Sequence, residues 1–259
     1  MDNFNNRKKH LFRFYIFVFM YIFMALFILY LTFRAVTVTP AGNIAFLSVT
    51  ATDINNSDNF NKKSNKPVII IDAGHGGIDS GAVGIDNILE KDINLSVALK
   101  LKRLFKISNC EVILTRETDI MLNEDGAKKK KSSDLSNRVK IANKYSDAIF
   151  ISIHMNKFPQ EKYKGMQIFF SQNNLDSANL AELLKKNNKS YLQPENNREI
   201  KRGKDIFVLE NIKTIGILIE CGFLSNQEEA NLLIREDYQN KLAKIIFASI
   251  IEFEKKFAE

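Results

Sequence analysis

Between residues 67 and 259, short continuous apolar runs alternate with stretches in which apolar residues recur every three to four positions. The short runs are typical of buried β-strands, and the periodic stretches are typical of amphipathic helices. The expected strands are 68–71, 111–114, 148–153, 166–170 and 215–219, and the expected helices are 90–106, 135–142, 177–187, 227–234 and 238–257. This alternation predicts an α/β fold, a three-layer sandwich with a mainly parallel twisted sheet flanked by helices.

An uncharged, almost wholly apolar run covers residues 14–33, which is about the length that a helix needs to cross a bilayer. Basic residues crowd positions 7–13 before it, and only Arg34 follows closely. The positive-inside rule therefore places the N-terminal tail in the cytoplasm and the rest of the chain outside. The alternative is a cleaved signal peptide, whose apolar region usually spans about 7–15 residues and precedes a small-x-small site. Residues 34–40 contain no clear site of that kind, so we expect a transmembrane anchor that stays attached.

The chain divides on these grounds into a cytoplasmic tail (1–13), a transmembrane anchor (14–33), a flexible linker (34–66) and a folded domain (67–259). The second half of the linker is rich in Asn, Ser, Lys and Asp and has almost no apolar periodicity. The formal net charge is +7, but the domain holds 29 Lys and Arg against 27 Asp and Glu. Because the excess lies close to the anchor, we expect no nucleic-acid partner.

Two cysteines, Cys110 and Cys221, each flank an apolar strand-like run. A domain of this size folds on its hydrophobic core and does not need disulfides. We therefore expect two buried thiols, with a single bridge between them as the alternative.

Two histidines of the domain, His75 and His154, each come just after an apolar run. The carboxyl ends of parallel strands gather on one edge of an α/β sheet, where binding sites form. Glu90 adds a carboxylate at the start of a helix, and two imidazoles with one carboxylate form a recurrent catalytic zinc set. The alternative is that each histidine is a packing or surface residue. The interval of 15 residues from His75 to Glu90 does not decide between them, because it is not a diagnostic metal spacing.

Glu220 ends another apolar run, 217–219, so a carboxylate leaves a buried strand on the same expected edge. Partial desolvation would raise the pKa of Glu220 into the range of a general base. A glutamate in solvent or paired with a lysine is the alternative. Downstream, Ser225 and Glu228 match a capping box that would start the next helix.

Two further motifs receive other interpretations. The glycines of 74–81 are not followed by Gly-Lys-Ser/Thr, so a nucleotide-binding loop is disfavoured and a tight turn beside the metal is favoured. The lysine run 128–131 is expected to be a solvated loop, with contact to an anionic wall polymer or a membrane surface as the alternative.

Six motifs in one order resemble a known family. They are Val68-Ile-Ile-Ile-Asp-Ala-Gly-His-Gly-Gly77, Glu90-Lys-Asp-Ile-Asn-Leu95, Leu114-Thr-Arg-Glu-Thr-Asp119, Arg138-Val-Lys-Ile-Ala-Asn143, Ile151-Ser-Ile-His-Met-Asn156 and Glu220-Cys-Gly-Phe-Leu-Ser-Asn226. Together they resemble the zinc-dependent N-acetylmuramoyl-L-alanine amidases of bacterial cell-wall turnover, over essentially all of 67–259. The resemblance implies that His75, Glu90 and His154 bind zinc and that Glu220 is the catalytic glutamate. The implied reaction is hydrolysis of the amide between muramic acid and the first L-alanine of the stem peptide.

The anchor, the single domain and the Asn/Lys/Ile-rich composition are most similar to the sporulation and germination members of that family, which act on spore-cortex peptidoglycan. The resemblance implies a peptidoglycan substrate, while the apolar run and its basic flank predict a membrane contact through the N-terminal helix and a catalytic domain outside the cytoplasm. An extracytoplasmic protein activator is also expected, because the chain shows no wall-binding repeats. Two departures from the family pattern are Ala73, where proline is frequent, and a longer stretch between Asp119 and Arg138.

Two other functions are weighed against the amidase. Another zinc polysaccharide hydrolase, such as a deacetylase, would normally bring an Asp-rich metal set, which this sequence lacks. A non-catalytic wall-binding or scaffolding protein on the same fold would not need His75, Glu90, His154 and Glu220 together.

Overall fold

The computed structural model describes residues 67–257. The predicted tail, anchor and linker in 1–66 lie outside the described residues. Within 67–257, no helix combines the length and the apolar character that a membrane span requires.

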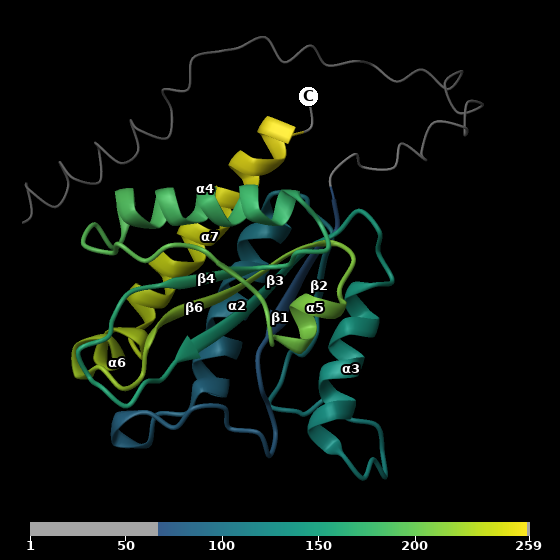
Figure 1. The fold of residues 1–259 in the computed structure, drawn as a ribbon, viewed down its shortest axis with the longest axis horizontal. Coiled ribbons are helices and arrows are strands. Elements are labelled where there is room, and N and C mark those ends of the chain that lie inside the picture. Colours follow the sequence, from purple (N-terminus) through teal and green to yellow (C-terminus); the bar gives the residue numbers. More distant parts are fainter. Residues whose placement is uncertain (1–66, 258–259) are drawn as a thin grey trace, which may run out of the picture. The chain divides into compact units, whose positions relative to one another are not determined.

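Six strands form one sheet in the order β2-β1-β3-β6-β4-β5, with helices between and around them (Figure 1). The strands are β1 (Ile69–Ala73), β2 (Val112–Leu114), β3 (Ile149–Asn156), β4 (Gln167–Phe170), β5 (Lys201–Arg202) and β6 (Ile215–Phe223). The helices are η3 (Ile85–Asn87), α2 (Glu90–Ile107), α3 (Lys130–Ala142), α4 (Asp176–Tyr191), α5 (Phe207–Asn211), α6 (Gln227–Leu233) and α7 (Glu236–Phe257). The α/β prediction is confirmed, and every expected strand and helix is present within a few residues of its expected bounds.

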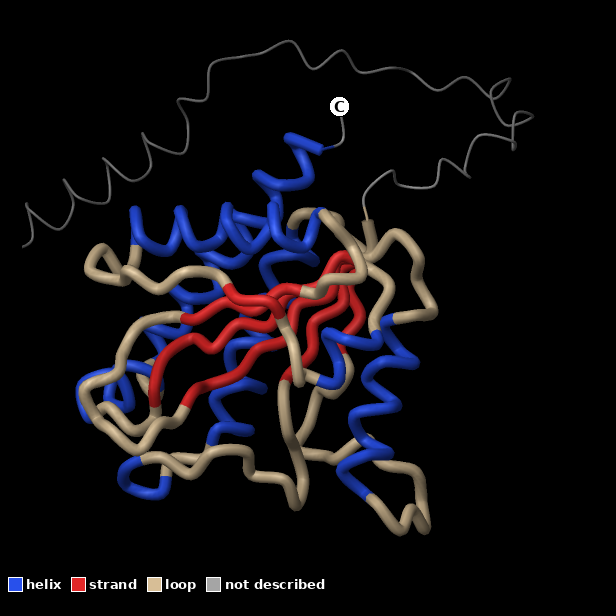
Figure 2. The backbone as a smooth tube through the Cα atoms, in the orientation of Figure 1, coloured by secondary structure: helices blue, strands red, loops and turns tan. Residues whose placement is uncertain are grey.

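The sheet is mixed, because β4 runs antiparallel to β6 while the pairs β1–β2, β1–β3, β3–β6 and β4–β5 are parallel. A parallel return needs a crossover of a dozen or more residues, usually with a helix. The link from β3 to β4 is shorter and contains no helix, so β4 reverses direction. Figure 2 shows these strands as one twisted layer, with helices on both sides.

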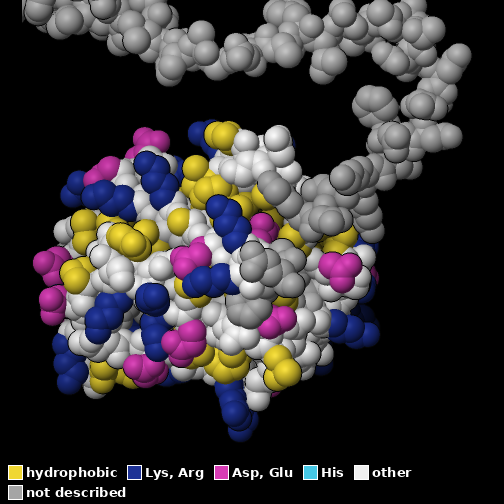
Figure 3. Space-filling view, turned by 90° about the horizontal axis from the view of Figure 1, so that it is seen from above, with side chains coloured by type: hydrophobic (Ala, Val, Ile, Leu, Met, Phe, Trp, Pro, Cys, Tyr) yellow, Lys and Arg dark blue, Asp and Glu magenta, His cyan; other side chains and the backbone are white. Residues whose placement is uncertain are grey.

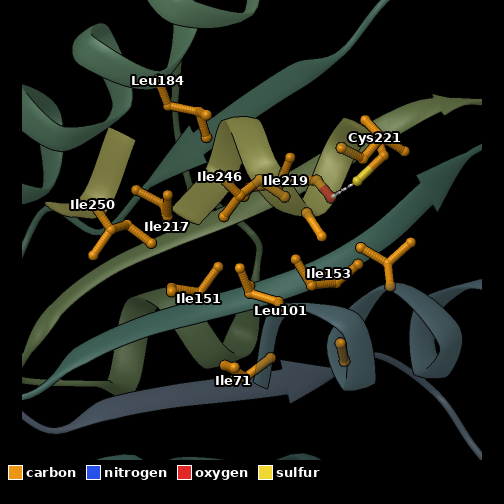
Figure 4. Close-up of a cluster of buried hydrophobic side chains, with 14 of the residues drawn as sticks. Ile71, Leu101, Ile151, Ile153, Leu184, Ile217, Ile219, Cys221, Ile246 and Ile250 are labelled. Atoms are coloured by element: carbon orange, nitrogen blue, oxygen red, sulfur yellow. Dashed lines mark hydrogen bonds between the residues drawn. The ribbon is translucent and has the colours of Figure 1, made fainter. Parts of the chain in front are cut away.

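Side chains of the central strands alternate between two apolar clusters, as the period of a strand requires. One cluster joins residues such as Ile71, Ile151 and Ile217 to α2, α4 and α7, and Figure 4 shows part of it. The other cluster contains Ile70, Phe150 and Leu218 and packs against α3 and α5. Truncating one of these isoleucines to alanine would cost roughly 2–5 kcal/mol. The same alternation turns Asp72, Ser152 and Glu220, each two residues further along its strand, toward the α3 side.

Two local predictions are wrong. The cap of α6 is Asn226, whose side chain accepts a hydrogen bond from the Glu229 N–H (3.0 Å), while the Ser225 hydroxyl accepts one from the Phe158 N–H (3.0 Å). The helix therefore begins one residue later than the Ser225 capping box would require. The lysine run is not wholly a loop, because α3 already begins at Lys130.

The cysteines are buried thiols without a disulfide between them, as expected. Burial raises the pKa of the Cys221 thiol far above its usual range. On the face seen in Figure 3, acidic and basic side chains are interspersed, which agrees with the near-balanced charge of residues 67–259.

Candidate metal centre and catalytic carboxylate

His75 lies in a tight turn that directly follows β1. Its φ of 61° is in the left-handed region, which a residue with a side chain adopts only under constraint. Two buried arginines supply that constraint. Arg138 donates hydrogen bonds to the carbonyls of Ala73 (2.9 Å) and His75 (2.8 Å), and Arg116 donates to those of Ala73 (2.9 Å) and Gly74 (3.0 Å). The turn that presents His75 is therefore held on its carbonyl side.

Arg138 is itself the centre of a buried ion-pair network. Its guanidinium contacts Asp72 (2.6 Å) and Asp134 (2.7 Å). Asp72 also accepts hydrogen bonds from Ser152 (2.6 Å) and Thr115 (2.8 Å). Burial opposes ionisation of Asp72, but Arg138 and these hydrogen bonds outweigh it and lower the pKa of Asp72. The network joins β1, β3 and α3 beneath the turn.

Glu90 is the first residue of α2, and its carboxylate lies between the two histidines. Oε2 is 3.2 Å from Nε2 of His75, and Oε1 is 2.8 Å from Nδ1 of His154. The backbone N–H groups of Ala82 (2.7 Å) and Met155 (3.1 Å) donate to the same carboxylate. Burial opposes ionisation, but the two imidazoles outweigh it and hold the pKa of Glu90 far below its usual range. The Glu90 carboxylate is therefore ionised and held in place by these hydrogen bonds.

His154 lies on β3, and its ring meets that of His75 edge to face, with centroids 5.0 Å apart. Gly74 is required here, because a Cβ at that position would overlap the His154 ring. The two histidines thus approach each other across a backbone without a side chain.

The side chains of His75, Glu90 and His154 form one group, whose donor atoms all lie within 4.8 Å of one another. Two neutral imidazoles and a carboxylate suit a zinc ion and leave a coordination position open. The donor set, the short separations and the ionised state of Glu90 fit a divalent metal. The structure thus brings together the three residues that the sequence singled out as ligands.

Asp79 also contacts His75 and was not predicted from the sequence as a site residue. Its Oδ2 lies 2.9 Å from Nδ1 of His75, so the other ring nitrogen, Nε2, faces Glu90. A carboxylate on the second nitrogen of a ligating histidine fixes the tautomer and the ring orientation. Burial alone would lower the pKa of His75, but the contacts with Glu90 and Asp79 outweigh this effect, and the pKa is raised. The spacing of four residues from His75 to Asp79 was the available signal.

Asn94 was also missed, although it lies one helical turn after Glu90. Its side-chain N–H donates to Oε1 of Glu90 (3.2 Å) and to the carbonyl of Gly74 (3.2 Å). It therefore ties the start of α2 to the turn after β1.

Glu220 lies on β6 opposite His154 and is not one of the three grouped donors. Its Oε2 is buried and, among the described residues, has no hydrogen-bond partner. Burial raises the pKa of Glu220 to about 7, and the charge of Glu90 adds to this while the two histidines oppose it. A carboxylate that exchanges a proton near neutral pH is suited to general acid–base chemistry.

Comparison with known proteins gives a consistent family. The N-acetylmuramoyl-L-alanine amidase family matches residues 69–252. The germination-specific N-acetylmuramoyl-L-alanine amidase of Bacillus subtilis is 37% identical over 189 residues, which are 72% of this chain and 79% of that protein.

Solved structures agree with this match. The CwlD amidase from Clostridioides difficile, in complex with the GerS lipoprotein, is 41% identical and has a TM-score of 0.70 over 73% of this chain and 99% of that one. An N-acetylmuramoyl-L-alanine amidase from Clostridium difficile 630 is 28% identical, with a TM-score of 0.65 over 75% of this chain and 100% of that one. The chain therefore belongs to the N-acetylmuramoyl-L-alanine amidase family and is a peptidoglycan amidase.

Proposed function

We propose that this amidase uses a zinc ion held by His75, Glu90 and His154, with Glu220 as the catalytic carboxylate. The observation that carries the proposal is the juxtaposition of three converging donor atoms with a buried carboxylate oxygen that has no partner among the described residues. The register that pairs His154 with Glu220 across β3 and β6 supports their action on one bond.

When bound, zinc supplies Lewis acidity, which acidifies water and polarises a carbonyl. The chain's own groups do the rest. Glu220 takes a proton from the attacking water and returns it to the nitrogen of L-alanine as the amide bond breaks. A pKa of about 7 suits both steps, since the group must accept and release a proton near neutral pH.

Asp79 and Asn94 are positioning residues in this proposal. Asp79 holds Nδ1 of His75 and leaves Nε2 for the metal, while Asn94 holds the Glu90 carboxylate. The two arginines beneath the turn keep His75 in its constrained conformation.

The physiological role that we propose is maturation of spore-cortex peptidoglycan, or its turnover at germination. The likeness to the germination-specific amidase of Bacillus subtilis and to the CwlD amidase supports it. Because that CwlD amidase was solved with the GerS lipoprotein, we also propose that an extracytoplasmic protein of that kind binds and activates this chain.

The tail (1–13), anchor (14–33), linker (34–66) and zinc amidase domain (67–259) remain our proposed organisation, with the domain on the cell-wall side of the membrane. The basic flank and the apolar run of the sequence support it. N-terminal sequencing of protein from its native membrane tests the anchor. A mature N-terminus between residues 35 and 66 would identify a signal peptide instead.

Digestion of purified peptidoglycan, followed by mass spectrometry, tests the reaction. We expect glycan strands with free lactyl carboxyl groups and peptides with a new N-terminal alanine. Release of acetate, or of new reducing sugar ends, in place of these products would point to a different hydrolase.

A further inference from the structure

A pocket of about 530 Å³ lies apart from the candidate metal centre, and none of His75, Glu90 and His154 lines it. Two loops form its walls, 162–165 after β3 and 192–198 after α4, and α6 and the start of α7 close it. Its volume is in the range of small-ligand sites. The lining combines three cationic side chains, three glutamates, carboxamides, tyrosines and leucines.

Hydrogen bonds within the protein hold one wall of the pocket, the loop 192–198, in place. Gln193 donates to the hydroxyl of Tyr238 (2.9 Å) and accepts from the Met166 N–H (2.8 Å). Asn196 donates to the Met166 carbonyl (2.9 Å). These bonds fasten the loop 192–198 to the start of β4 and to α7, so a ligand would meet fixed walls.

A series of contacts links this pocket to the donor group along the carboxyl edge of the sheet. The Ala82 N–H donates to Glu90, and the next residue, Val83, accepts a hydrogen bond from the Lys157 ammonium (2.7 Å). Phe158 then packs edge to face on Tyr163, which lines the pocket, with ring centroids 4.8 Å apart.

The opposite wall is tied to β6, the strand of Glu220. Glu229 accepts hydrogen bonds from the N–H groups of Gly165 (2.8 Å) and Phe223 (2.7 Å). Phe223 ends β6, three residues after Glu220, which corresponds to roughly 10 Å of extended chain. The wall of the pocket at Phe223 is thus about three amino-acid lengths from the proposed reaction centre.

Arg198 lines this pocket, and its guanidinium has a geometry suited to binding an anion. Its guanidinium lies over the ring of Phe223 (4.6 Å) and near that of Tyr163 (5.9 Å), and its Nε donates to the Lys164 carbonyl (2.9 Å). Within residues 67–257 it forms no salt bridge, and its two terminal nitrogens make no hydrogen bond. An arginine stacked on aromatic rings with its fork free is suited to bidentate binding of a carboxylate.

Two of the three glutamates that line the pocket already have partners. Both carboxylate oxygens of Glu229 accept backbone N–H groups, and Glu228 lies 3.6 Å from the Lys164 ammonium. The neighbouring Lys162 adds a second cation above the Tyr163 ring (5.5 Å). Glu195 is the third glutamate of the lining, so the three cations and the three carboxylates balance in number, and the attraction for an anion comes from the Arg198 fork.

From this arrangement we infer that the pocket binds the acidic part of the stem peptide beyond its first alanine, with Arg198 holding a peptide carboxylate. The inference rests on the proposed function, because it assumes that the amide next to the pocket is the one cleaved. The peptide fits better than the glycan, since the lactyl carboxyl of muramic acid is used up in the amide and the free carboxylates of the substrate lie on the stem.

The test measures binding of the free stem tetrapeptide to the full-length chain by isothermal titration calorimetry. A second probe is the same tetrapeptide with its carboxylates converted to carboxamides. We expect Arg198→Gln to weaken binding of the acidic tetrapeptide about tenfold, the loss of roughly one charged hydrogen-bonded contact. Arg103→Gln, which removes the same charge from an exposed position of α2 outside the pocket, should leave the affinity unchanged.

Amidation of the tetrapeptide should reproduce the tenfold loss in the unaltered protein and cause no further loss in Arg198→Gln. This arm remains valid if the Arg198 variant fails to fold, because it alters only the ligand. Equal binding of the acidic and amidated peptides by the unaltered protein would overturn the inference, as would an unchanged affinity of a folded Arg198→Gln.

Cleavage of peptidoglycan by the same preparation separates the two proposals. If the protein cleaves the muramoyl–alanine amide but does not distinguish the two peptides, only the pocket inference fails. If it cleaves no such amide, the proposed function fails, and the pocket loses its reason to hold a stem peptide.

Discussion

The strands β1 and β6 each carry a buried carboxylate toward the carboxyl end, and the surroundings shift the pKa values of the two groups in opposite directions. Asp72 on β1 accepts hydrogen bonds from Thr115, Ser152 and Arg138, and its pKa is lowered although burial opposes this. Glu220 on β6 has an oxygen without a partner among the described residues, and burial raises its pKa to about 7. At the end of β1 the carboxylate holds a turn in place. Toward the end of β6, on the same edge of the sheet, the carboxylate stays available for a proton.

The contrast separates support from chemistry at this sheet edge. A saturated carboxylate stabilises the fold but cannot take part in proton transfer at neutral pH. An unsatisfied buried one costs stability, and such groups cluster at functional sites. Removing the charge at each position should therefore change stability with opposite signs.

The largest effect on stability is expected for Asp72→Asn. It takes one partner from the buried ion pair with Arg138, a change that costs roughly 3–5 kcal/mol. Urea denaturation measures the free energy of unfolding. Because the pKa of Asp72 is lowered, its contribution is present above the unfolded pKa and is lost as pH falls, so the difference between the two proteins should shrink in acid.

Asp125→Asn is the matched control, since Asp125 is exposed, and it should change stability by no more than about 0.5 kcal/mol. An equally small effect of Asp72→Asn would mean that the network beneath the turn does not support the fold.

A smaller effect is expected for Asp79→Asn, which weakens the hold on Nδ1 of His75. Loss of such a partner typically lowers metal affinity by roughly 10–100-fold. Competition with a zinc chelator measures it, with Asp125→Asn again as the control. Unchanged zinc affinity would leave Asp79 without an orienting role.

The smallest effect has the opposite sign to that of Asp72→Asn. In metal-free protein, Glu220→Gln removes a buried carboxylate that must ionise without a hydrogen bond to Oε2. The raised pKa of Glu220 contributes stability at low pH that is lost as pH rises through about 7. The variant should therefore be more stable than the unaltered protein by roughly 1–3 kcal/mol at pH 8, and no more stable at pH 4. Destabilisation at pH 8 would remove the contrast between the two strand ends.

Much of the fold could be predicted from the sequence, because strand and helix periods are local signals. Val68–Ile71 and the run before His154 are short continuous apolar runs, and both form strands close to their expected bounds. The direction of β4 was not predicted, since it depends on the absence of a crossover helix in a short link. The short elements β5 and α5 span too few residues to display a period.

The site was predictable where a residue follows a continuous apolar run of the sequence. His75, His154 and Glu220 stand out for that reason, and Glu90 was recognised by its helix start and by the family resemblance. Asp79, Asn94 and Arg138 act through contacts with other segments, such as the Arg138 bond to the His75 carbonyl, 63 residues away. Such contacts exist only after folding. The predicted anchor lies outside the described residues and remains a prediction.

The central claim is that Glu90 holds the metal while Glu220 handles the proton, and one paired measurement tests it directly. Zinc content by elemental analysis and the rate of peptidoglycan cleavage are determined for Glu90→Gln and Glu220→Gln. We expect Glu90→Gln to lose zinc and activity together. We expect Glu220→Gln to keep stoichiometric zinc but to lose roughly 10²–10⁴-fold in rate, the usual scale of general acid–base catalysis. Loss of zinc from Glu220→Gln, or a rate within a few-fold of the unaltered enzyme, would contradict the division of roles.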